Sequence, residues 1–157
     1  MDVTIRRFQT GDGEAAFDVF VRSVRQLGSA SYTPDQIEAW LSGMTPERLE
    51  SRLRAMVSFI AENAGNVVGF SSLDSRHAEL DFLYVDPSYA RCGIGGILAR
   101  RVESAAQEIK IDRLFIVASL NAVHIYERLG YEHEYDMSKT IDGVKVDCVR
   151  MAKSLVK

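Results

Sequence analysis

The sequence predicts an α/β (α+β) domain with a mixed, mostly antiparallel central sheet, and three observations support this class. The hydrophobic pattern gives the element order β-α-α-α-β-β-β-α-β-α-β-β, in which a run of strands precedes one crossover helix. A turn signal at residues 63–66 joins the first two strands of that run as a hairpin. The chain has 157 residues, 46% of them hydrophobic, which suits one domain spanning 1–157 with its own core.

The first third of the chain predicts one strand and three helices. Apolar residues over 3–8 fall near strand alternation, and Asp12 is then expected to cap a first helix, which ends near residues 28–31. Thr33 and Thr45 each precede a proline. A capping residue followed by proline is typical of a helix start, so two short helices are expected there.

The rest of the chain alternates between strands and helices. A hairpin of residues 57–62 and 67–73 leads into a strand at 79–85, and a helix follows a glycine-rich loop. The later elements are a buried strand at 114–118, a helix over 121–129, a half-exposed strand at 131–136 and a last strand after Asp142-Gly143.

Three glycines lie between the strand at 79–85 and the following helix. Gly93, Gly95 and Gly96 leave the backbone open to close approach, and the first N–H groups of a helix have no intrahelical partners. We therefore expect a bound phosphate ester, the alternative being a helix start that merely needs glycine. A dinucleotide fingerprint would require glycine where Leu98 stands, and the chain has no Gly-Lys-Ser/Thr tripeptide of a P-loop.

Composition narrows the class of function. A net charge of −3 argues against nucleic-acid binding and suits a cationic substrate. Cys92 and Cys148 form no Cys-x-x-Cys motif and the three histidines lack ligand spacing, so we expect no metal site and a reducing compartment. The N-terminus has no apolar signal core and no apolar run approaches the length of a membrane span, which predicts a cytoplasmic protein without membrane contact.

Two segments of the chain resemble the motifs of a known family. Residues 83–95, Leu-Tyr-Val-Asp-Pro-Ser-Tyr-Ala-Arg-Cys-Gly-Ile-Gly, resemble the pyrophosphate motif of the Gcn5-related N-acetyltransferase (GNAT) superfamily. Residues 119–131, Ser-Leu-Asn-Ala-Val-His-Ile-Tyr-Glu-Arg-Leu-Gly-Tyr, resemble its second signature. The segment from Tyr32 to Trp40 is most similar to the bacterial YafP-like branch. The resemblance covers nearly the whole chain.

The resemblance implies the acyl-CoA N-acyltransferase fold, with helices on both faces of a sheet that splays between its fourth and fifth strands. It also implies transfer of an acetyl group from acetyl-CoA to an amine within a ternary complex. Tyr126 matches a tyrosine that contacts the cofactor and protonates the departing CoA thiolate. The backbone of the strand would bind pantetheine through Leu83, Tyr84 and Val85. N–H groups of the loop would hold the pyrophosphate at Arg91, Cys92, Gly93, Ile94, Gly95 and Gly96.

Other roles implied by the resemblance stay open between neighbouring residues. Glu79 matches a frequent general base, with Asp81 or a water as the alternative base and Asp81 also a substrate contact. Either Ser119 or Asn121 would touch CoA. Where the family pattern has Gln or Arg at the start of the loop, this chain has Ala90, followed by Arg91. The first helices line the acceptor groove in this fold, so Tyr32 and Trp40 are further substrate-binding candidates.

The expected acceptor is the primary amine of a small molecule, with a protein N-terminus or lysine as the alternative. A homodimer paired near the C-terminal strands would also fit the resemblance. Two other classes of function are kept open. One is a non-catalytic acyl-CoA-binding or protein-interaction module on the same fold, and the other is an unrelated α/β phosphate binder.

Overall fold

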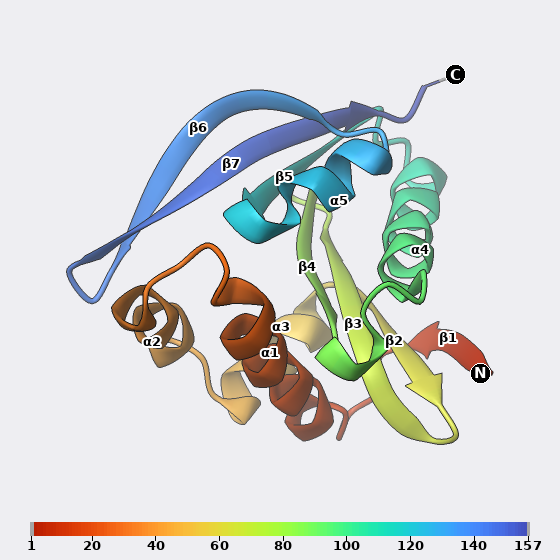
Figure 1. Ribbon diagram of the computed structural model, residues 1–157. Helices are drawn as coiled ribbons and strands as arrows, with labels where there is room; N and C mark the ends of the chain where they lie inside the picture. Colours follow the sequence, from red (N-terminus) through yellow and green to blue (C-terminus); the bar gives the residue numbers. More distant parts are fainter. Residues whose placement is uncertain (1, 157) are drawn as a thin grey trace.

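The computed structural model describes residues 2–156, so Met1 and Lys157, the two ends of the predicted domain, lie outside it. Its strands are β1 (Val3–Arg7), β2 (Val57–Asn63), β3 (Asn66–Asp74), β4 (Glu79–Val85), β5 (Arg113–Ser119), β6 (Glu132–Ile141) and β7 (Val144–Ser154). Its helices are α1 (Gly13–Gly28), α2 (Pro34–Ser42), α3 (Pro46–Ala55), α4 (Ile94–Glu108) and α5 (Val123–Arg128), with short 3-10 turns η1 (Pro87–Tyr89) and η2 (Leu120–Ala122). Figure 1 shows this order, which is the predicted one.

The strands form a seven-stranded sheet in the order β1-β2-β3-β4-β5-β7-β6. Neighbouring strands run antiparallel except β4 and β5, which are parallel. The register of that pair contains one position, Glu79 opposite Phe115, and the Phe115 N–H also donates to the Ala78 carbonyl at 2.9 Å. Beyond this point the two strands separate. The predicted mixed sheet and the predicted splay between β4 and β5 are therefore both confirmed.

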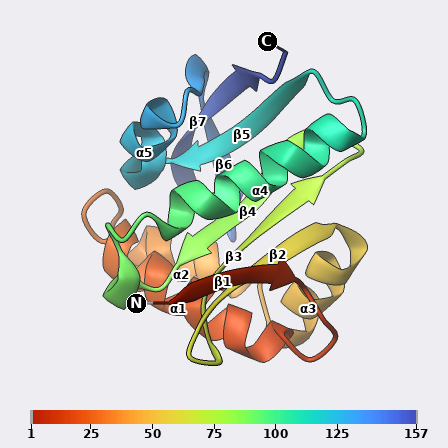
Figure 2. The same ribbon diagram turned by 90° about the vertical axis from the view of Figure 1, so that its right-hand side faces the viewer.

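Helices cover both faces of the sheet, as predicted, and each face has its own core. Figure 2 shows α4 lying across one face, with α1, α2 and α3 on the other. Under α4 the core includes Leu98, Val102 and Ile116, and Tyr126 of α5 joins it. On the opposite face it is built by buried side chains of α1, α3 and the sheet, among them Phe20, Leu49, Leu53, Ile60 and Phe70. Between residues 2 and 156 no helix is both long and apolar enough to span a bilayer.

The start of α1 differs from the prediction. Asp12 stands at the N-cap, but its side chain accepts no capping hydrogen bond. Its carboxylate is engaged by the Arg6 guanidinium, at 2.7 and 2.9 Å, and by the Gln9 N–H at 2.7 Å. Glu50 of α3 performs the capping instead, because its carboxylate accepts from the Gly11 and Gly13 N–H groups. The cap thus comes from a residue far along the chain.

The starts of α2 and α3 are as predicted. The Thr33 hydroxyl accepts from the Gln36 N–H at 3.2 Å, and the Gln36 side chain accepts from the Thr33 N–H at 2.9 Å, which completes a capping box. Thr45 accepts from the Arg48 N–H at 3.1 Å in the same way. These two helices form one side of the site described below.

Close packing of α4 on the sheet depends on Gly69 of β3. A Cβ atom at this position would stand 3.0 Å from Leu98 Cδ1 and 3.0 Å from the Tyr84 carbonyl oxygen. The backbone oxygen cannot move without disturbing the β3–β4 pairing, so the space is available only to glycine. This contact fixes the distance between β4 and the helix that follows the glycine loop.

Gly69→Ala should lower the free energy of unfolding by about 1–3 kcal/mol, because the added methyl overpacks the junction of β3, β4 and α4. Urea denaturation followed by circular dichroism measures the change. The matched control is Gly43→Ala, where nothing lies within 4 Å of the new methyl and φ is negative, and where the change should stay within about 1 kcal/mol. Equal effects of the two substitutions would contradict the packing argument.

Candidate functional site

A cavity of about 330 Å³ opens where β4 and β5 separate. Its walls come from four parts of the chain: the two separating strands, the η2–α5 segment, the first three helices, and the β6–β7 hairpin. Figure 1 shows that hairpin extending from the sheet across to α2. The side chain of Gln36 donates to the Lys145 carbonyl at 3.0 Å and ties the two together. Among the lining residues are Trp40, Asp81, Leu83, Tyr84, Ser119 and Tyr126.

The backbone of β4 is accessible along this opening. Its other edge pairs with β3 from Glu79 to Val85, whereas its pairing with β5 ends at Glu79. An unpaired strand edge presents a row of N–H and C=O groups that can pair with an extended ligand. Of the three residues predicted to bind pantetheine, Leu83 and Tyr84 line the cavity, and Val85 lies at the end of the strand beside the glycine loop.

The glycine loop continues directly from this end of β4. Gly93 has φ +83°, and α4 begins at Ile94, whose buried side chain anchors the turn in the core. The Ile97 N–H is the first to donate within the helix, to the Gly93 carbonyl at 3.2 Å, so the N–H groups of Ile94, Gly95 and Gly96 have no intrahelical acceptor. A Cβ on Gly95 would lie 3.8 Å from Val85, which shows how closely the helix start approaches the strand. The predicted anion site therefore adjoins the cavity.

Arg91 and Cys92 occupy the exposed part of the loop. Arg91 has φ +64°, a left-handed conformation, and the structure gives its side chain no ion pair within residues 2–156. The Arg91 guanidinium is therefore available beside the helix start, next to Ala90, where the family pattern has a polar or charged side chain.

An ion pair that the sequence did not reveal holds this loop against α1. The Asp86 carboxylate at the end of β4 accepts from Arg22 Nε and Nη2 at 3.0 and 2.6 Å, and also from the Ser88 N–H at 2.9 Å. Burial alone would raise the pKa of Asp86, but the Ser88 N–H and the Arg22 guanidinium outweigh it and lower that pKa.

Tyr126 lies on α5 with its ring packed edge-on against Tyr131, the ring centroids 5.8 Å apart. The side chain lines the cavity although the residue is only 7% exposed. Burial raises the pKa of Tyr126, so its hydroxyl stays protonated across the physiological range and can donate a proton.

Ser119 and Asn121, the two candidates for a CoA contact, lie in different situations. Ser119 lines the cavity at the end of β5. The Asn121 side-chain oxygen is buried and has no hydrogen-bond partner within the described chain. A buried acceptor of this kind needs a donor to offset its lost hydration, and an N–H group of a ligand would supply one.

Two carboxylates of β4 occupy different positions relative to the cavity. The register opposes Ser72 to Phe82 and Leu73 to Leu80, so Asp81 is the extra residue of a β-bulge. Asp81 lines the cavity, and Glu79 does not. Burial is the main cause that raises the pKa of Glu79, and the charge of Asp81 raises it further, which indicates that the two carboxylates interact.

Arg52 of α3 holds Asp81 in place. Its guanidinium donates to Asp81 Oδ2 at 2.8 Å and lies over the Phe82 ring, 4.6 Å from the centroid. Burial raises the pKa of Asp81, and the charge of Arg52 offsets part of that rise. The sequence did not identify Arg52, because its only local signal is a basic residue in the last turn of a helix.

Tyr32 joins three segments that surround the cavity. Its hydroxyl donates to the Asp147 carbonyl of β7 at 2.6 Å and accepts from the Leu120 N–H of η2 at 2.9 Å. The ring, which meets Trp40 edge-on with centroids 5.4 Å apart, lines the cavity. Both predicted aromatic residues therefore lie in the cavity wall, and the Tyr32 hydroxyl is occupied by the protein itself.

The split sheet and the adjoining helix start define a class of α/β protein in which an unpaired strand edge leads to a helix N-terminus. Comparison with known proteins shows which family within this class the chain belongs to. The family model described as "Acetyltransferase (GNAT) domain" matches residues 29–155, and the chain belongs to this family. The resemblance drawn from the two sequence motifs is thereby confirmed.

Two relatives cover nearly the whole chain. The uncharacterized N-acetyltransferase YafP of Escherichia coli K12 is 29% identical over 147 residues, which are 94% of this chain and 88% of YafP. A crystal structure of a GCN5-related N-acetyltransferase from Rhodopseudomonas palustris superimposes with a TM-score of 0.93 at 29% identity, covering 98% of this chain and 96% of that one.

A third comparison concerns a structure with a bound ligand. The PaiA N-acetyltransferase of Thermoplasma acidophilum, in complex with coenzyme A, has a TM-score of 0.81 at 22% identity, covering 98% of this chain and 99% of that one. At this identity the likeness shows that the fold is shared. Within residues 2–156, no group of three or more His, Cys, Asp or Glu side chains could hold a metal ion.

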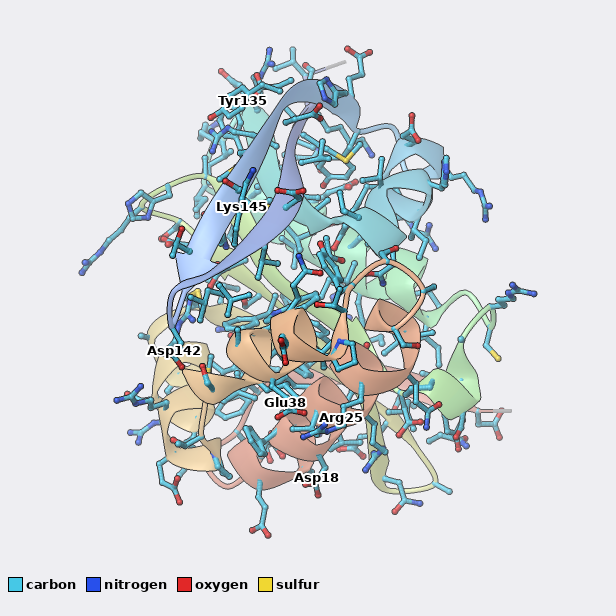
Figure 3. The ribbon with its side chains drawn as sticks, turned by 60° about the vertical axis from the view of Figure 1, so that its left-hand side comes forward. Asp18, Arg25, Glu38, Tyr135, Asp142 and Lys145 are labelled. Carbon is cyan, nitrogen blue, oxygen red and sulfur yellow. The ribbon has the colours of Figure 1, made fainter. Side chains whose placement is uncertain are left out.

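Tyr32→Phe should lower the free energy of unfolding by about 1–3 kcal/mol, because it leaves the Leu120 N–H and the Asp147 carbonyl without their partner. Urea denaturation measures the effect. Tyr135→Phe is the matched control, since Tyr135 is 52% exposed on β6 (Figure 3) and should change stability by less than about 0.5 kcal/mol. A Tyr32→Phe variant as stable as the control would contradict the role of this hydroxyl.

Proposed function

We propose that the protein is an acetyl-CoA-dependent N-acetyltransferase that acts on the primary amine of a small molecule by direct attack in a ternary complex. The observation that carries this proposal is the cavity between β4 and β5, which opens along the unpaired edge of β4, the strand that leads to the helix start at Gly93. Membership of the GNAT family supports the reaction class.

The arrangement of donors fits coenzyme A without a metal or further cofactor. The N–H groups of residues 91–96 would hold the pyrophosphate, and the α4 dipole favours its negative charge. The free edge of Leu83, Tyr84 and Val85 would pair with pantetheine, and the orphaned Asn121 oxygen would accept from one of its amide N–H groups. When bound, acetyl-CoA supplies the acetyl group as an activated thioester.

A carboxylate next to the cavity would prepare the amine for attack. An alkylamine has a pKa near 10.4, so at pH 7 only about one molecule in 10³ is unprotonated, and a base that removes its proton is useful. Asp81 is supported for this role by its place in the cavity wall, and Glu79 would act beside it through water. This preference reverses the order suggested by the resemblance alone.

The remaining steps use backbone and tyrosine donors. The amine nitrogen would attack the thioester carbonyl carbon of acetyl-CoA, and negative charge would develop on the carbonyl oxygen. An N–H of the free β4 edge would donate a hydrogen bond to that oxygen. As the carbon–sulfur bond breaks, the Tyr126 hydroxyl would donate its proton to the departing sulfur. Because burial raises the pKa of Tyr126, its contribution comes from its position beside the sulfur rather than from strong acidity.

Incubation with acetyl-CoA and a panel of amines should release free thiol, and Tyr126→Phe should lower kcat by about 10²-fold. The panel contains small amines and a lysine peptide, and a thiol reagent follows turnover. Tyr135→Phe, which removes a hydroxyl outside the cavity, should leave kcat unchanged.

Three results would contradict the proposal. If acetyl-CoA neither raised the melting temperature nor reacted with any amine, the assigned activity would be wrong. Turnover of the peptide alone would favour a protein acceptor. Binding of CoA without turnover, and without any effect of Tyr126→Phe, would instead favour a non-catalytic module.

The base should appear in the pH profile of kcat/KM. A carboxylate base acts when deprotonated, and burial raises the pKa of both Asp81 and Glu79, so kcat/KM should fall as the pH drops through that raised pKa. Asp81→Asn should remove this acidic limb and lower kcat/KM by about 10²-fold, with a smaller effect from Glu79→Gln. Asp142→Asn, an exposed change at the hairpin tip (Figure 3), is the control. A larger loss in Glu79→Gln would assign the role to Glu79.

A further inference from the structure

The wall of the cavity includes an exposed lysine that forms no ion pair within residues 2–156. The β6–β7 hairpin carries four Lys and Arg side chains, and three of them form ion pairs: Lys145 with Asp147, Arg150 with Glu134 and Lys153 with Glu103. The fourth, Lys139, forms none with residues 2–156. Lys139 is also the member of this group that lines the cavity between β4 and β5.

The other charges of the cavity wall are already arranged in a pair. Arg52 is held by Asp81 at 2.8 Å and by the face of Phe82, so its charge is partly neutralised. One oxygen of Asp81, Oδ1, takes no part in that bond and remains available to an ammonium group. The wall thus offers one carboxylate oxygen and one unpaired ammonium.

These charged groups lie away from the glycine loop. Asp81 is near the start of β4, whereas the loop follows Val85 at the end of that strand. Lys139 lies on β6 opposite Val146 of β7. Burial raises the pKa of Glu79, Asp81 and Cys148, and the ammonium of Lys139 offsets part of each rise. Lys139 therefore acts on the acceptor end of the cavity and not on the phosphate end.

From this juxtaposition we propose that the acceptor is an amine that also carries a carboxylate, an amino acid, with its carboxylate on Lys139 and its amino group at Asp81. The inference rests on the proposed function and names the acceptor class. A cation in a partly enclosed cavity attracts an anionic group and repels a second ammonium, so it selects against polyamines. Trp40, Met44 and Phe82 line the same cavity and would contact an apolar side chain of the acceptor.

The test compares amino acids with the amines that lack only the carboxylate: phenylalanine with phenethylamine, tyrosine with tyramine, and lysine with cadaverine. With the wild-type protein and saturating acetyl-CoA, kcat/KM should be about tenfold or more higher for phenylalanine than for phenethylamine, since one charge-assisted hydrogen bond is gained. Lys139→Gln should abolish this ratio, and Lys139→Glu should invert it. The KM for acetyl-CoA should stay the same in both variants.

Lys145→Gln is the matched control. Lys145 lies on the same hairpin (Figure 3) but pairs with Asp147 and does not line this cavity, so the ratio between the two acceptors should not change. Equal loss for the acid and the amine in Lys139→Gln, or a wild-type preference for cadaverine over lysine, would overturn the inference while leaving the acetyltransferase proposal intact. Failure of all acceptors would overturn both.

Discussion

The separation of β4 from β5 is the constraint on which the rest of the structure depends. The two strands share one bridge at Glu79 and Phe115 and then part, although each keeps its full pairing on its other side, β4 with β3 and β5 with β7. A sheet interrupted in this way leaves backbone N–H and C=O groups unpaired, which is unfavourable unless water or a ligand satisfies them. The opening is therefore the place in the sheet where an extended ligand could pair with the backbone of β4.

Contacts between distant segments keep the opening in shape. Tyr32 links η2 to β7, the Arg22–Asp86 ion pair fixes the end of β4 to α1, and a buried network joins α4 to the sheet beyond it. In that network Glu103 accepts from the Tyr131 hydroxyl and from Lys153, each at 2.9 Å. Each of these links is a satisfied hydrogen bond or ion pair between distant segments, which favours one arrangement of the cavity walls.

Local patterns predicted the parts of the fold that local interactions determine. The Thr33 capping box, the glycine loop and the element order depend on residues close together in sequence, and all three were predicted. The sequence could not show that Glu50 replaces Asp12 as the cap of α1, because Arg6 takes the Asp12 carboxylate and Glu50 lies on another helix. Strand alternation likewise cannot reveal the bulge at Asp81, which exists only in the register of β4 against β3. Tyr32 was a predicted candidate, whereas Arg52 and Lys139 reach the cavity wall only through tertiary contacts.

The charge of the whole chain and the charge of the site lead to different expectations. A net charge of −3 suits a cationic acceptor, because the long-range field attracts positive ligands. In the cavity wall, however, Arg52 and Lys139 face Asp81, with Glu79 outside, so the acidic character of the surface does not extend into the site. Since charges beyond about 10 Å are screened at physiological ionic strength, the few groups that line the cavity outweigh the remainder of the surface in selecting a bound ligand. The overall charge therefore influences the approach of an acceptor, whereas we propose that Lys139 and Asp81 select among the acceptors that enter the cavity.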